Sequence, residues 1–360
     1  MEFAQHLTQN PTDPARRAEI LSDPGFGQYF TDHTVVIDWT EGTGWHDARI
    51  EPYGPIALDP AASVLHYGQE IFEGLKAYRF ADGSVQTFRP EKNAARLNTS
   101  ARRLALPELP EELFLEAIKL LVATDADWVP DGDGESLYLR PFMISTEAFL
   151  GVRPAKQVSF RVIASPAGNY FGGELHAVPI WLSEKYARAG HGGTGEAKCG
   201  GNYAASLAAQ LEAEEHGCSQ VLFLDPTDDY AVEELGGMNV FFVIDGDTLL
   251  TPALNGDILH GVTRDSVLSF AADLGLTVQE RRITFAEWKQ LLSEGRLNEV
   301  FACGTAAVIT PVSELRTADG NLTFPDTDQA TSVWGRIRQH LLDVQTGAAE
   351  DTKGWMRRLA

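Results

Sequence analysis

The first half of the chain alternates apolar and polar positions over short stretches separated by turn-forming residues, a pattern typical of strands in hairpins. Residues 33–39 read HTVVIDW and precede the turn EGTG at 41–44, and the turn ADGS at 81–84 separates two more apolar stretches. The pattern predicts strands at 33–39, 74–80, 85–88, 137–145 and 158–164.

Helical periodicity appears twice in the same half. Residues 90–104 begin with a proline, which the first turn of a helix tolerates, and apolar residues recur three and four positions apart within 110–127. Both stretches are predicted helices. Residues 1–30 are expected to form a loosely structured arm, because Pro11, Pro14 and Pro24 should break any helix there.

Strands and helices alternate after residues 165–175 (SPAGNYFGGEL), which are rich in glycine and turn formers. The periodicity predicts strands at 176–183, 220–224, 240–244 and 299–303, and helices at 204–216, 264–274, 285–294 and 333–344. Because regular βαβ order is absent, a mixed α/β (α+β) fold is expected rather than a doubly wound sheet. The predicted domains are an N-terminal arm (1–30), a small N-terminal α/β domain (31–169), an interdomain linker (170–178) and a large C-terminal domain (179–360).

Composition and charge exclude several classes of protein. The 360 residues are 44% apolar and 22% charged, as in ordinary globular proteins, and the net charge of −22 repels nucleic acid and anionic membranes. No apolar run is long enough to span a membrane, and the N-terminus lacks a signal-peptide pattern, so we expect a cytoplasmic protein. Three cysteines without a C-x-x-C pair, and histidines without H-x-x-x-H spacing, predict neither a disulfide framework nor a metal site.

Lys198 occupies an unusual loop, GHGGTGEAKCGG at 190–201, in which six of twelve residues are glycine. Glycine lets a backbone approach a ligand closely, and a lysine held there can act as a nucleophile toward a carbonyl. That chemistry suits a Schiff base with pyridoxal phosphate. A solvated lysine in a flexible surface loop is the alternative, and local composition alone favours it.

A pyridoxal site also needs an anion for the pyridine nitrogen and amides or hydroxyls for the phosphate. Glu234 precedes a glycine pair, Thr263 could be the N-cap of a helix, and Thr305 follows a strand that is expected to be buried. Taken singly, these residues are better explained as a solvated acid, a cap and a turn residue.

Six stretches in order make the sequence resemble the branched-chain amino acid aminotransferases, a pyridoxal-phosphate family of fold type IV. They are HYGQEIFEGLKAY (66–78), YLRP (138–141), KCGGNYAAS (198–206), EELGGMNVF (233–241), HGVTR (260–264) and CGTAA (303–307). The resemblance implies a two-domain enzyme with its active site between the domains. It also implies reversible ping-pong transfer of the amino group between L-leucine, L-isoleucine or L-valine and 2-oxoglutarate.

The resemblance assigns roles by position. Lys198 corresponds to the catalytic lysine that binds pyridoxal 5'-phosphate, and Glu234 to the partner of the pyridine nitrogen. The other implied cofactor contacts are Arg96, Tyr203, Val262, Thr263 and Thr305. The implied substrate contacts are Phe26, Tyr67, Phe72, Tyr138, Arg140, Tyr170, Thr305 and Ala306.

By the same resemblance, Tyr67 would enter the site from a neighbouring subunit, which implies a homodimer. The other expected partners are the small-molecule substrates. A D-amino acid aminotransferase or an aminodeoxychorismate lyase of the same fold is the closest alternative. A pyridoxal-binding carrier without catalysis is a more distant one.

Overall fold

The computed structural model describes residues 1–132, 134–168 and 176–360, which divide into two compact units. Unit 1 comprises Met1–Gly173, Ala197–Gly200 and Asp343–Ala360, and unit 2 comprises Glu174–Glu196 and Gly201–Leu342. The predicted linker at 170–178 lies largely outside the described residues.

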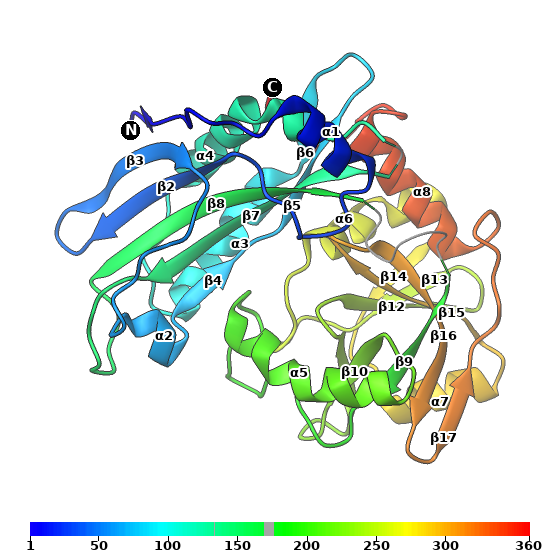
Figure 1. The fold of residues 1–360 in the computed structure, drawn as a ribbon. Coiled ribbons are helices and arrows are strands. Elements are labelled where there is room, and N and C mark those ends of the chain that lie inside the picture. The colour runs from blue at the N-terminus through cyan, green and yellow to red at the C-terminus, as the bar shows by residue number, and fades with distance from the viewer. Residues whose placement is uncertain (133, 169–175) are drawn as a thin grey trace. The chain divides into compact units, whose positions relative to one another are not determined.

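Within its described residues, unit 1 contains a sheet of nine strands in the order β1-β3-β2-β8-β7-β5-β6-β18, with β4 paired to β7 (Figure 1). All pairings are antiparallel except that of β1 with β3. The two hairpins predicted from alternating hydrophobicity, β2–β3 and β5–β6, therefore lie on either side of the central strands β8 and β7. The strands are β1 (Ala4–Gln5), β2 (His33–Thr40), β3 (Gly44–Pro52), β4 (Glu70–Phe72), β5 (Leu75–Arg79), β6 (Val85–Phe88), β7 (Ser136–Ser145), β8 (Gln157–Ala167) and β18 (Met356–Arg358).

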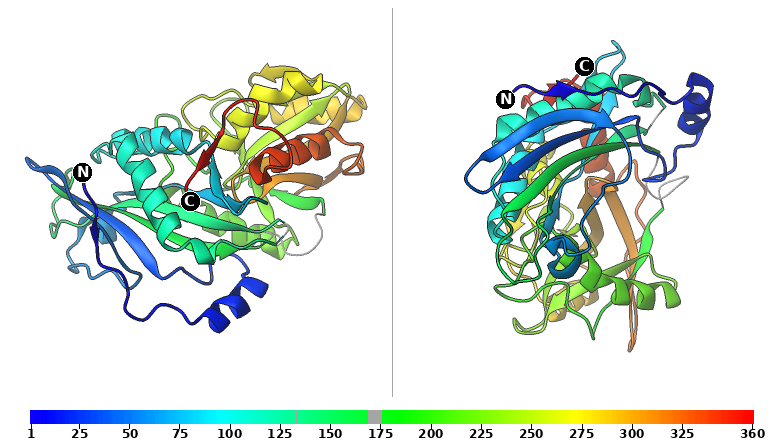
Figure 2. Two further views of the ribbon diagram at one scale, coloured as in Figure 1. Left: turned by 90° about the horizontal axis from the view of Figure 1, so that it is seen from above. Right: turned by 60° about the vertical axis from the view of Figure 1, so that its left-hand side comes forward.

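Helices α3 (Pro90–Arg103) and α4 (Glu111–Thr124) cover one face of this sheet (Figure 2). Their apolar residues share a core with the strands: Leu97 and Phe114 are almost fully buried, and the Phe114 ring lies 6.0 Å from that of Phe160 on β8. The helical periodicity in the sequence thus marks the faces that pack on the sheet.

The prediction that prolines exclude a helix from residues 1–30 is wrong. Helix α1 (Pro14–Ser22) begins with Pro14 in its first turn, where a proline ring costs no hydrogen bond. Asp13 caps it by accepting a hydrogen bond from the backbone N–H of Ala15 at 2.9 Å. A second short helix, α2 (Ser63–Tyr67), was also not predicted.

Nine strands form the sheet of unit 2 in its described part, in the order β11-β10-β9-β16-β15-β12-β13-β14, with β17 paired to β16. Parallel pairs, β9 with β10, β9 with β16 and β13 with β14, occur beside antiparallel ones, so this sheet is mixed. The sequence did not predict the ten-residue β16, which contains Pro311. The strands are β9 (Val178–Leu182), β10 (Gln220–Asp225), β11 (Ala231–Leu235), β12 (Asn239–Ile244), β13 (Thr248–Thr251), β14 (Thr277–Glu280), β15 (Leu297–Gly304), β16 (Val308–Thr317) and β17 (Gly320–Thr323).

The helices associated with this sheet are α5 (Gly200–Glu215), α6 (Val262–Phe270), α7 (Phe285–Ser293) and α8 (Val333–Thr346). Trp288 of α7 is completely buried, with its ring 4.8 Å from that of Phe242 and 5.6 Å from that of Phe324. Among the described residues, no helix has both the length and the apolar character that crossing a membrane would require.

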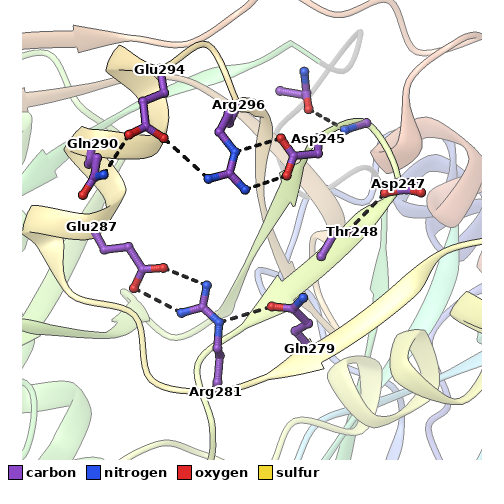
Figure 3. A network of polar contacts seen from close by, with 11 residues as sticks. Asp245, Asp247, Thr248, Gln279, Arg281, Glu287, Gln290, Glu294 and Arg296 are labelled. Atoms are coloured by element: carbon purple, nitrogen blue, oxygen red, sulfur yellow. Dashed lines mark hydrogen bonds and ion pairs between the residues drawn. The ribbon is translucent and has the colours of Figure 1, made fainter.

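A surface network on unit 2 consists of arginine–carboxylate pairs (Figure 3). Arg296 Nη2 lies 2.7 Å from Asp245 Oδ2, and Arg281 Nη2 lies 2.7 Å from Glu287 Oε1. About half of the Arg296 and Asp245 side chains is exposed, so solvent and salt screen this pair. We therefore regard this network as a feature of the protein surface and not as part of the predicted active site.

The two units differ from the predicted domains where the chain returns to unit 1. Strand β18 pairs with β6, and the Tyr78 hydroxyl donates to Gln345 Oε1 at 3.1 Å, so the C-terminal residues belong with the N-terminal sheet. The short segment Ala197–Gly200 also belongs to unit 1, and it contains the lysine of the glycine-rich loop.

Candidate active site

The backbone around Lys198 is fixed on unit 1 by hydrogen bonds on both sides of the lysine. Its N–H donates to Ser100 Oγ at 2.9 Å, its carbonyl accepts from the N–H of Phe72 at 3.0 Å, and the Gly200 N–H donates to Glu70 Oε1. The side chain is half-buried, with Nζ 5.0 Å from the centroid of the Phe72 ring. These contacts favour a fixed lysine over the alternative of a solvated lysine in a flexible surface loop.

Glu70 was not recognised from the sequence. Burial raises the pKa of its carboxyl group, and the Gly200 N–H and the charge of Arg140 oppose that rise. A Cβ at position 200 would overlap Glu70 Oε1, so glycine there lets the Glu70 carboxylate approach the backbone two positions after the lysine.

Four predicted substrate residues form a continuous cluster with the lysine. The Arg140 guanidinium lies 4.7 Å from the Phe72 ring centroid, and its Nη2 donates to the Tyr138 hydroxyl at 3.0 Å. The Phe26 ring packs edge-on against Tyr138 with centroids 5.0 Å apart. Arg140 Nε is buried and donates to no described acceptor, which suits a site for an anionic group.

Arg96, the predicted phosphate ligand, is buried beside a carboxylate that the sequence analysis did not single out. Its Nε and Nη2 lie 2.7 and 2.8 Å from the two oxygens of Glu73, which is fully buried, and Asn93 Nδ2 donates to Glu73 Oε2 at 2.8 Å. Such a two-point contact fixes the plane of the guanidinium.

Two predicted substrate residues lie outside this cluster. The Tyr67 side chain is 44% exposed at the end of α2, and its hydroxyl donates to the carbonyl of Leu150. Tyr170 lies outside the described residues.

Glu234 lies within strand β11 of unit 2 and is 1% exposed, so the alternative of a solvated acid is wrong. Its Oε2 lies 3.0 Å from Nε of Arg188, and its Oε1 accepts from the N–H of Leu259. Arg188 is itself buried and donates through Nη1 to the carbonyl of Asp257 at 2.8 Å. This arginine stabilises the ionised form of a carboxylate that has lost its water.

Asn239 links three of the sequence-predicted segments within unit 2. Its Nδ2 donates to the carbonyl of Leu259 at 3.0 Å, close to Gly261, the N-cap of α6. In the sheet, Asn239 is paired with Cys303, two residues before Thr305.

The predicted phosphate contacts occupy two turns. Val262 and Thr263 are the first two residues of α6, whose leading amides have no partner within the helix. Thr263 itself is not the N-cap, which was the alternative role considered for it. Thr305 and Ala306 form the turn between β15 and β16.

Tyr203 lies in the first turn of α5, five residues after Lys198, and is half-buried. A Cβ on Gly237 would lie 3.3 Å from its ring atom Cε1. Glycine at position 237 therefore lets the turn after β11 approach the Tyr203 ring.

The side chains and backbone amides of the predicted site fit pyridoxal 5'-phosphate. Unit 1 provides the primary amine of Lys198 and a buried arginine, and unit 2 provides the buried Glu234, the amides that begin α6, and the Thr263 and Thr305 hydroxyls. These are the anion, cation and amide groups that such a cofactor requires. The placement of the active site between the domains stays a prediction.

Residues 70–315 match the family model for Amino-transferase class IV. The chain therefore belongs to the class IV aminotransferases, and the family predicted from the sequence motifs is confirmed. The prediction of a pyridoxal-phosphate-dependent transaminase is confirmed with it.

Named relatives match along the whole chain. The branched-chain-amino-acid aminotransferase of Mycolicibacterium smegmatis is 56% identical over 363 aligned positions, covering 100% of this chain and 98% of the relative. The enzyme of the same name from Mycobacterium tuberculosis is 53% identical with the same coverage.

Solved structures agree in fold. The branched-chain amino acid aminotransferase of Escherichia coli has a TM-score of 0.73 at 27% identity, covering 90% of this chain and 99% of that one. A further branched-chain amino acid aminotransferase, solved with pyridoxamine 5'-phosphate, has a TM-score of 0.72 at 32% identity, with coverages of 90% and 98%.

Proposed function

We propose that the protein is a branched-chain amino acid aminotransferase that moves an amino group between L-leucine, L-isoleucine or L-valine and 2-oxoglutarate. The observation that carries this assignment is the cluster of Lys198, Phe72, Arg140, Tyr138 and Phe26 within one unit. It combines a primary amine, an aromatic wall and a cation, which are the three groups that this pair of substrates needs. Full-length relatives of that name support the assignment.

Bound pyridoxal 5'-phosphate supplies an aldehyde that takes up the amino group and a ring that accepts electrons. In the first half-reaction Lys198 Nζ would accept the proton from the substrate Cα and then donate it to the cofactor carbon, and in the second half-reaction the same amine would move a proton in the opposite direction. Glu234 would supply negative charge for a protonated ring nitrogen, and Arg188 pairs with that carboxylate. The amides of Val262 and Thr263 would hold the phosphate, and Arg96 is the cation proposed for it.

The two substrates differ only in the side chain that this cluster must accept. The rings of Phe72, Tyr138 and Phe26 offer apolar contact to a branched aliphatic chain. Arg140 Nε, which has no acceptor among the described residues, offers a donor to the second carboxylate of glutamate. Discrimination among the three branched substrates should be weak, because one methylene is worth about 1–3 kcal/mol.

A substrate panel with 2-oxoglutarate as acceptor tests the assignment. We expect turnover of the three branched L-amino acids. Transamination of D-alanine alone would assign the D-amino acid aminotransferase function instead, and release of pyruvate from aminodeoxychorismate would assign the lyase. Spectral conversion of the holoenzyme by L-leucine alone excludes a carrier without catalysis.

Arg140→Leu tests the dual use of the cluster. We expect single-turnover conversion by L-leucine to persist, while KM for 2-oxoglutarate rises at least about tenfold, since hydrogen bonds to charged groups contribute about 1.5–3 kcal/mol each. An equal loss for both substrates would contradict separate roles for the rings and the guanidinium. Tyr138→Phe is the matched control, because it removes the hydroxyl that accepts from Arg140 but keeps the ring.

We also propose that the protein is a homodimer to which Tyr67 contributes across the interface. Support comes from exposed apolar side chains around it: Leu65, Leu150 and Val152 are 59%, 61% and 86% exposed. Val152→Glu should shift the sedimenting species toward monomer. Tyr230→Glu, which changes an exposed side chain of unit 2, is the control. An unchanged dimer in Val152→Glu would exclude this surface.

A cytoplasmic location stays a prediction.

A further inference from the structure

Three acidic side chains from separate elements of unit 2 converge in its interior. Asp225 ends β10, Glu233 lies in β11 and Asp257 lies in the loop before α6. One carboxylate oxygen from each lies within 4.8 Å of the others, and all three residues are buried. We call these residues the three-carboxylate cluster.

Two members of the cluster lack the partners that buried carboxylates require. Asp257 is 1% exposed, and neither of its carboxylate oxygens accepts a hydrogen bond from the described residues. Glu233 is 3% exposed, and its Oε2 likewise accepts no hydrogen bond from the described residues. Because buried polar atoms are nearly always paired, these three oxygens indicate a missing positive partner.

The two cationic side chains nearby, Arg188 and His191, do not supply this positive partner. Arg188 directs its Nε to Glu234 and its Nη1 to the backbone carbonyl of Asp257. His191 Nδ1 lies 3.5 Å from Asp257 Oδ2, but its side chain is 82% exposed and therefore well solvated.

We propose that the three-carboxylate cluster binds one hard divalent cation, of which Ca²⁺ is the best match. Carboxylate oxygens are the ligands that such ions prefer. Ca²⁺ binds oxygen ligands at about 2.3–2.6 Å, and one such ion can reach three carboxylate oxygens that lie within 4.8 Å of one another. Mg²⁺ usually keeps several waters and is held by only one or two carboxylates, so a buried set of three suits Ca²⁺ better.

The proposed ion would stabilise the loop that leads to the catalytic lysine. A Cβ at Gly195 would overlap the carbonyl oxygen of Asp257, so the glycine-rich loop packs directly against this residue. Arg188 joins the same carbonyl to Glu234. The cation site itself depends only on the three carboxylates and would exist whatever reaction the enzyme performs.

Calcium titration of the holoenzyme tests the proposal. Chelator-treated protein is titrated with CaCl2 by isothermal calorimetry at about 0.15 M KCl, which screens the acidic surface. We expect one Ca²⁺ per chain and at least a tenfold weaker affinity in Asp257→Asn and in Glu233→Gln. Asp319→Asn removes the same charge from an exposed turn and should bind as the wild type does. Absence of binding at millimolar Ca²⁺, or unchanged binding in both cluster variants, overturns the proposal.

Thermal unfolding separates a lost ligand from a damaged fold. CaCl2 should raise the Tm of the wild type, and in chelator Asp257→Asn should unfold at the same temperature as the wild type or higher, because one repelling charge is gone. The Tm of this variant should no longer respond to Ca²⁺. A wild-type Tm that is identical in chelator and in CaCl2 refutes a cation bound only by the folded state.

Discussion

Replacing Arg188 by leucine would leave Glu234 as a buried charge without its cationic partner. Glu234 is 1% exposed, and the Leu259 N–H, which donates to it, carries no full charge to replace the guanidinium. Breaking a buried ion pair from one side costs about 3–5 kcal/mol, or roughly two to four orders of magnitude in the unfolding equilibrium. Turnover should fall as well, because an unpaired buried carboxylate takes up a proton and no longer serves a protonated ring nitrogen.

A double-mutant cycle with Glu234→Gln separates the ion pair from the other contacts of the arginine. Arg188 also donates from its charged guanidinium to the carbonyls of Asp257, at 2.8 Å, and Gly195, at 3.3 Å, and Arg188→Leu removes these hydrogen bonds in either background. In the Glu234→Gln background, Arg188→Leu should therefore cost less than in the wild type, because no buried carboxylate is left behind. Urea unfolding of the wild type, the two single variants and the double variant measures the cost of Arg188→Leu in each background. Equal costs in both backgrounds would refute the reasoning, because the backbone contacts alone would then explain the effect.

Three further predictions concern other parts of the molecule. Glu73→Gln should weaken cofactor binding, measured by titration with pyridoxal phosphate, because Arg96 loses the carboxylate that fixes its plane. Burial raises the pKa of the Cys303 thiol to about 12, so this cysteine should not react with a thiol reagent at pH 8 until urea unfolds the protein. Arg296→Ala should leave the urea midpoint nearly unchanged at high salt, because its ion pair is half-exposed.

Each of these predictions has a control or a contradicting result. Glu91→Gln, which breaks the exposed ion pair with Arg357, should leave cofactor affinity unchanged. Rapid labelling of Cys303 in the folded protein would contradict its burial. A large drop in the urea midpoint for Arg296→Ala at both low and high salt would show that the surface network stabilises the fold.

The sequence by itself located Lys198, because its signal is local: a lysine among closely spaced glycines just before a helix. The hairpins of unit 1 and most helices were also predictable, since hydrophobic periodicity is a property of neighbouring residues. Helix α1 was missed because a proline at the first helical position was treated as a breaker.

Residues that act through long-range contacts carried no such signal. Arg188 is 46 positions from Glu234, and Glu73 is 23 positions from Arg96, so only the folded chain brings the partners within hydrogen-bonding distance. The three-carboxylate cluster was missed for the same reason, because its members come from three elements and show no ligand spacing.

Local patterns in the sequence therefore determined the elements, the reactive lysine and, through six ordered motifs, the family. Tertiary structure decided which charges are buried, what neutralises them and which acids are left unpaired. The physical reason is that burial and pairing depend on distances between elements, which the order of residues along the chain does not specify.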